Sequence, residues 1–123
     1  MNTIEELKND FLVECHDDYV GLWSLIWTIE NEMRETDPQR IRALTISLIT
    51  ELLKQGLIKA GMPNAHGEFE EWRASPDEIV KRIEKEWDQL GREPNLGDVV
   101  WFTTTKKGDA QIQPGRGSDS TWI

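Results

Sequence analysis

The residue types best suited to chemistry gather in one short segment, which reads Glu14-Cys15-His16-Asp17-Asp18. It contains carboxylates, an imidazole and a thiol, the groups that bind metal ions or serve as a nucleophile and its base. Neighbouring side chains on a helix point about 100° apart, so few of the five can reach one ion. We therefore expect a solvated acidic junction between two helices, without a metal or a cofactor.

Other motifs of catalysis do not occur in the sequence. Residues 115–118 read GRGS, but they lack the lysine and the following helix of a phosphate loop. No serine lies in the pattern of a nucleophile elbow. We expect a protein that is not an enzyme, and a metal-binding protein or an enzyme remains the second alternative. That alternative would be built around Glu14, Cys15, His16 and Asp18.

The charge of the chain indicates the kind of partner. The formal net charge is −9, and residues 1–36 alone carry two basic and nine acidic side chains, whereas residues 37–61 have a net charge of +2. Such a surface repels phosphate backbones over most of its area and attracts basic proteins. We therefore predict a protein partner, with nucleic acid disfavoured. Its expected contacts are Asp17, Asp18, Glu30, Glu32 and Trp122.

Length and composition favour one small cytoplasmic domain. The 123 residues suffice for a single core, to which six tryptophans can contribute. We expect a helical domain over residues 1–113 and a flexible tail over residues 114–123, since PGRGSDS is rich in glycine and serine. The N-terminus lacks the layout of a signal peptide, and no apolar run is long enough for a membrane. The single cysteine also favours a reducing compartment.

Apolar periodicity predicts four helices, near residues 4–14, 18–34, 38–55 and 76–90. The fold class is therefore mainly α within α+β: a four-helix domain with a small C-terminal antiparallel β-hairpin. Residues 98–105, DVVWFTTT, have high β propensity and supply its first strand. Residues 106–109 would turn the chain, and residues 110–113 would return as the second strand.

The boundaries of two helices are marked most clearly. Asp37 can cap the third helix and Pro38 suits its first turn, while Gly56 can end it in a left-handed conformation. Ser75 and Glu78 have the spacing of a capping box for the fourth helix. On the second helix, Trp23 and Trp27 lie four residues apart, and Trp72, Trp87 and Trp101 could join them. We expect this aromatic face to pack into the core, and the alternative is a pocket or groove for a partner.

Two segments resemble parts of a winged-helix domain. ELLKQGLIKAG, residues 51–61, is similar to the end of a recognition helix that runs into the first wing strand, and VVWFTTTKKGDAQI, residues 99–112, is similar to a β-hairpin with a basic tip. Together these segments cover about a fifth of the chain. The resemblance implies a DNA-binding regulator, which is the first alternative, and its contacts would be Arg40, Arg42, Lys106 and Lys107.

The function favoured by the sequence is a non-enzymatic protein-binding module of the inhibitor, immunity or regulatory type. Small acidic cytoplasmic proteins that bear tryptophans include bacterial immunity and inhibitor proteins. The analogy rests on size, charge and composition, and on no shared motif. A homodimer is also expected, because the second and third helices are apolar over wide arcs and a short β element leaves an open edge.

Overall fold

The computed structural model describes residues 4–95 and 98–112, which form five helices and one four-stranded sheet. The mainly helical α+β class is thereby confirmed. In chain order the elements are α1 (Ile4–Asp17), β1 (Val20–Gly21), α2 (Leu22–Asn31), α3 (Pro38–Lys54), β2 (Ile58–Pro63), β3 (Phe69–Glu71), α4 (Pro76–Leu90), β4 (Trp101–Thr104) and α5 (Lys106–Gln111). The expected tail, including Trp122, lies outside the described residues.

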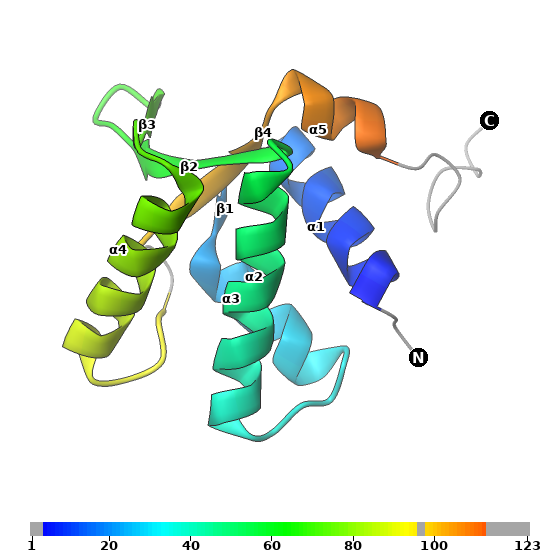
Figure 1. Ribbon diagram of the computed structural model, residues 1–123, viewed down its shortest axis with the longest axis vertical. Coiled ribbons are helices and arrows are strands. Elements are labelled where there is room, and N and C mark those ends of the chain that lie inside the picture. The colour runs from blue at the N-terminus through cyan, green and yellow to red at the C-terminus, as the bar shows by residue number, and fades with distance from the viewer. Residues whose placement is uncertain (1–3, 96–97, 113–123) are drawn as a thin grey trace.

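The sheet joins distant parts of the chain. Its strand order is β1-β4-β2-β3, and all three pairings are antiparallel. Trp101 pairs with Gly21 on one side and Gly61 on the other, so β4 lies between β1 and β2. In Figure 1 the sheet crosses the upper part of the view, and α1, α3 and α4 run down from it. These three helices thus lie on one side of the sheet, whereas α5 lies above it in this view (Figure 1).

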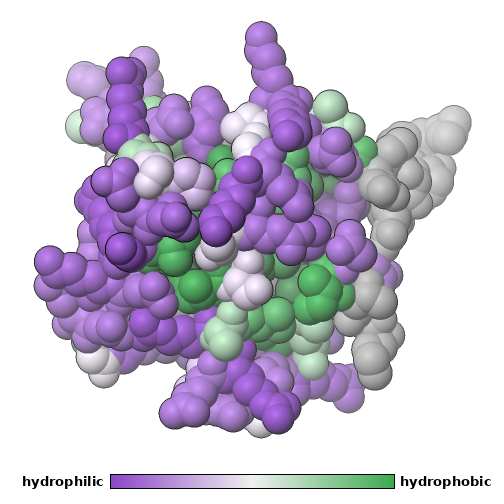
Figure 2. Space-filling view, viewed as in Figure 1, coloured by the Kyte–Doolittle hydropathy of each residue, from purple (hydrophilic) through white to green (hydrophobic). Residues whose placement is uncertain are grey.

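The core lies where these helices meet the sheet. Phe11 of α1 and Phe102 of β4 pack edge to face, with ring centroids 5.8 Å apart, and both are fully buried. Leu22, Ile49 and Ile83 bring α2, α3 and α4 into the same cluster. Figure 2 shows apolar side chains between the helices and polar side chains over most of the remaining face. Burial of these apolar groups is the main force holding the elements together.

The predicted boundaries of α3 and α4 are confirmed. The Asp37 side chain accepts a hydrogen bond from the backbone N–H of Gln39 at 3.0 Å, and Gly56 has a φ of 73° just after α3. Ser75 and Glu78 form the reciprocal capping box of α4, which ends at Gly91 in the left-handed conformation. Local sequence therefore determines where both helices begin and end.

Two predicted segments differ in the structure. The second helix begins at Leu22 rather than near residue 18, because Val20–Gly21 pairs with β4 as a strand. The return strand predicted at residues 110–113 is wrong, since Lys106–Gln111 forms α5. The Thr105 hydroxyl caps that helix by accepting from the Gly108 N–H at 2.9 Å. The hairpin in the described residues is instead β2–β3.

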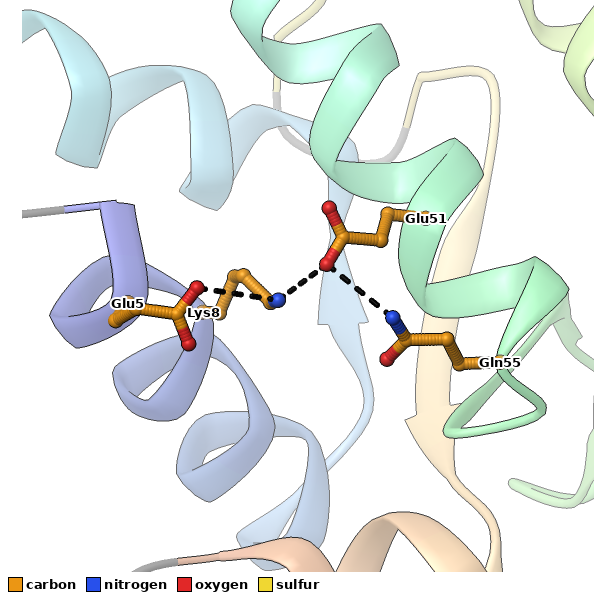
Figure 3. Close-up of polar contacts among 4 residues, drawn as sticks. All are labelled: Glu5, Lys8, Glu51 and Gln55. Atoms are coloured by element: carbon orange, nitrogen blue, oxygen red, sulfur yellow. Dashed lines mark hydrogen bonds and ion pairs between the residues drawn. The ribbon is translucent and has the colours of Figure 1, made fainter.

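An ion pair joins α1 to α3, which are separated in the chain by β1 and α2. The Lys8 ammonium group on α1 lies between the carboxylates of Glu5, one turn away, and Glu51, on α3 (Figure 3). Gln55 donates a further hydrogen bond to Glu51 at 3.3 Å. The Lys8 side chain is only 15% exposed, so this charged group is largely covered by the protein. Within the described part of the chain, no helix combines the length and apolarity needed to cross a membrane.

Candidate partner-binding surface

An acidic and aromatic groove lies where α1 gives way to β1 and α2. Its volume is about 370 Å³. Three carboxylates and three aromatic rings line it, together with the Ser24 hydroxyl: Glu14, Asp17, Asp18, Tyr19, Trp23 and Trp101. We call this set of residues the acid–aromatic groove. It combines negative charge with flat apolar surface.

The local backbone explains how the groove forms. The Asp18 N–H still donates to the Glu14 carbonyl oxygen at 3.0 Å, and the Asp18 carboxylate then accepts from the Tyr19 N–H at 2.7 Å. The chain therefore leaves the helix at this point and enters β1, where Gly21 pairs with Trp101. The carboxylates at the end of α1 are brought beside aromatic side chains from α2 and β4.

Trp23 and Trp27 are exposed, which corrects the expectation that they pack into the core. Their exposed fractions are 38% and 48%. The buried face of α2 is formed by other residues, among them Leu25, Ile26 and Ile29. The apolar arc of α2 is wider than the core can cover, so the two tryptophans are left on its solvent side. Large exposed aromatic side chains at one site are typical of an interaction surface.

Neighbouring carboxylates change the pKa of Glu14. Although Glu14 as a residue is exposed, the pKa of its carboxyl group is raised, first by partial desolvation and then by repulsion from Glu32 and Asp10. The Ser24 hydroxyl opposes that change by donating a hydrogen bond to Glu14 at 3.4 Å. The structure thus places Asp17 and Asp18 on the groove, and Glu32 close enough to act on Glu14. These are three of the predicted partner contacts.

The residues of the metal or enzyme alternative point in different directions. Cys15 is buried in the core, and burial raises the pKa of its thiol above the ordinary value, so it remains protonated. His16 turns toward α5, where its Nδ1 lies 2.8 Å from Oδ1 of Asp109. Glu14 and Asp18 instead line the groove. Over residues 4–95 and 98–112, no three His, Cys, Asp or Glu residues are grouped so as to hold a metal ion.

Glu30, another predicted partner contact, lies apart from the groove. It borders a second cavity, at the ends of α2 and α4, and forms a hydrogen bond with Glu93. Partial burial and the contact with Glu30 raise the pKa of Glu93 to about 7. The sequence did not single out Glu93, because it stands among ordinary loop residues and its partner is 63 positions earlier.

The four residues of the DNA-binding alternative are not brought together. Arg40 and Arg42 lie at the start of α3, and Arg42 forms an ion pair with Asp88 of α4. Lys106 and Lys107 begin α5, which follows strand β4 at the opposite end of α3 (Figure 1). A protein that grips a phosphate backbone needs its basic groups along one face. The arrangement therefore adds no support to DNA binding.

For the aromatic part of the groove, the sequence favoured core packing over the alternative of a partner groove. The width of the α2 arc could have shown that Trp23 is exposed. Trp101 was named with Trp23 from the sequence, but its place in the groove depends on its pairing with Gly21, which the sequence does not show. Trp122, the last predicted contact, lies outside the described residues.

We compared the chain with protein-family models, with curated proteins and with solved structures, and none of the three comparisons gave a match.

Proposed function

We propose that this protein is a non-enzymatic binding module for a basic protein partner, of the inhibitor, immunity or regulatory type. The observation that carries the proposal is the acid–aromatic groove, in which the exposed Trp23 ring lies beside Glu14, Asp17 and Asp18. A lysine or arginine side chain of the partner would meet both a carboxylate and an aromatic face there. Ion pairing and cation–π contact would then act on the same group.

The charge of the whole chain supports the same partner class. Nine acidic side chains lie in residues 1–36, the segment that supplies most of the groove. Opposite charge accelerates the encounter of two proteins and makes it sensitive to salt. Tryptophan is favoured at the few positions that dominate binding energy, so the exposed Trp23 supplies the affinity that exposed carboxylates alone lack.

The proposal also keeps two expectations from the sequence. The protein acts in the cytoplasm, where a reducing environment suits a single buried cysteine. It forms a homodimer, since two large aromatic side chains remain exposed on α2.

The test is an NMR titration with two synthetic peptides of equal length. One alternates glycine with lysine and arginine, and the other alternates glycine with glutamate. We expect the basic peptide to shift the amide signals of Asp17 and Asp18 and the indole signal of Trp23 at low salt, and high salt to weaken the effect. The acidic peptide should leave these signals unchanged.

Matched variants make the test specific. Trp23→Ala should weaken binding of the basic peptide about tenfold, the effect expected of a modest hot-spot residue. Glu86→Gln, which removes a carboxylate of α4 that pairs with Arg82, should leave binding unchanged. Absence of shifts at low salt, or equal effects of both substitutions, would contradict the proposal.

A further inference from the structure

A second cavity lies at the other end of α2, away from the acid–aromatic groove. Its volume is about 400 Å³, and it is bordered by the ends of α2 and α4, the first turns of α3, and the loop that follows α4. Ile41 and Trp87 are part of its lining, and they are 4% and 8% exposed. The volume is large enough for a small organic molecule, and its apolar surface comes from the small exposed parts of Ile41 and Trp87, beside the Arg42 guanidinium that lies 5.2 Å from the centroid of the Trp87 ring.

The charged groups of this cavity are unevenly matched. Arg42 forms an ion pair with Asp88, and Arg92 forms one with Asp98 at 2.8 Å. Each guanidinium group thus has a carboxylate partner, whereas Glu30 and Glu93 face each other. Two carboxyl groups share a hydrogen bond only when one of them holds a proton. A positive charge placed between them would replace that proton.

The helix ends favour the same sign of charge. α2 ends at Asn31 and α4 ends at Leu90, so the C-terminal ends of both helices border the cavity. Carbonyl groups at a helix C-terminus carry partial negative charge and stabilise cations. The N-terminal end of α3 also borders the cavity, but the Asp37 carboxylate already caps it.

We propose that this cavity binds a small organic ammonium ion, with the ammonium group between the Glu30 and Glu93 carboxylates and the hydrocarbon part against Ile41 and Trp87. The ammonium group donates hydrogen bonds to both carboxylates, and the proton that Glu93 held passes to solvent. The site is separate from the acid–aromatic groove, so it stands whether or not the groove binds a protein.

Protonation makes the proposed binding depend on pH. The pKa of Glu93 is raised to about 7, while an alkylammonium group keeps its charge well above that value. Below pH 7 the ligand competes with a proton, and above it both carboxylates are charged. Asp88, Arg42 and Arg92 are the other charged groups on the cavity, and both guanidinium groups are held in ion pairs. Affinity should therefore rise about tenfold between about pH 6 and pH 8.

The test is isothermal titration calorimetry with phenethylamine and, as a neutral control of the same shape, phenethyl alcohol. Nα-acetyl-lysine amide, which carries its ammonium group on a peptide unit, forms a second arm. We expect phenethylamine to bind, with the stated dependence on pH and with release of protons near pH 6, and the alcohol to bind at least about tenfold more weakly. If only the lysine derivative binds, the cavity is still an ammonium site, and the ammonium group that it binds belongs to a lysine side chain of a protein.

Two variants complete the design. Glu93→Gln keeps the size of the side chain and its hydrogen bond to Glu30 but removes one charge, and it should weaken phenethylamine binding about tenfold and abolish the pH dependence. Glu86→Gln, on the part of α4 that does not line this cavity, should change neither. Thermal unfolding of each variant confirms that it is folded. Equal binding of amine and alcohol, binding unchanged by Glu93→Gln, or no binding by either ammonium compound would overturn the proposal.

Discussion

The ammonium group of Lys8 and the carboxylate of Glu51 link α1 to α3 across 43 positions of the sequence. The hydrogen bond from Lys8 to Glu51 is the largest cause of the raised pKa of Lys8, which keeps the group charged throughout the physiological range. Because the Lys8 side chain is 15% exposed, this pair is less screened by water than other ion pairs of the surface. It is a direct side-chain contact between the first helix and the third.

We expect a double-mutant cycle of Lys8→Met and Glu51→Gln to give a coupling energy of about 1 kcal/mol, the upper end for partly covered ion pairs. Urea unfolding of the wild type, both single variants and the double variant provides the measurement. The pair of Lys54 and Asp77, at 3.5 Å with side chains 57% and 75% exposed, is the control and should give a coupling near zero. Equal coupling in the two cycles would show that burial does not set the strength of the Lys8 pair.

Gly61 is required where β2 pairs with β3. A Cβ atom at this position would lie 2.1 Å from the carbonyl oxygen of Glu70, and backbone cannot move aside as a side chain can. Gly61→Ala should therefore lower the free energy of unfolding by at least about 2 kcal/mol. At Gly21 a Cβ atom would meet only the Trp101 ring, at an ordinary 3.8 Å, so Gly21→Ala should cost less than about 1 kcal/mol. Urea midpoints compare the two, and similar losses would refute the steric argument.

The sequence predicted α3 and α4 well because their signals are local. Caps at Asp37 and Ser75 and the apolar stripes between caps lie within the segments that they specify. β1 could not be predicted in the same way, since its two residues are extended only because they pair with β4, some 80 positions later. The aspartates of the groove were predicted from charge. The exposure of Trp23 was not, because the apolar arc of a helix does not show which part its neighbours cover.

The Glu30–Glu93 contact should make stability depend on pH in an unusual direction. The pKa of Glu93 rises from 4.5 to about 7 in the folded protein, so the folded state binds more protons between these values. Its stabilising contribution is complete below about pH 4.5 and is lost as the pH rises through 7. Because Glu93 is exposed to solvent, we expect the loss to be about 1 kcal/mol.

Comparison of the wild type with Glu93→Gln isolates this contribution, since the variant cannot lose a proton at that position. Thermal unfolding at about pH 5 and about pH 8 should show the variant gaining stability relative to the wild type at the higher pH. A difference in stability between the two proteins that is the same at both pH values would contradict a proton shared by Glu30 and Glu93.

The oligomeric state is a separate prediction. We expect light scattering at micromolar concentration to report twice the 14.2 kDa mass of one chain, because Trp27 leaves 48% of its surface exposed beyond the lining of the acid–aromatic groove. Trp27→Asp should then shift the protein toward the mass of a single chain. If the wild type has the mass of a single chain, the predicted homodimer does not form.

The position of β4 also governs how the chain can fold as it is synthesised. This strand is the last of the four to be made, yet it lies between β1 and β2 and contributes the fully buried Phe102. A ribosome-bound chain that has not yet exposed residues 101–104 has β1 and the β2–β3 hairpin with nothing to join them. The helices made first can pack on one another, but the apolar surface that Phe102 covers stays open until this strand leaves the exit tunnel.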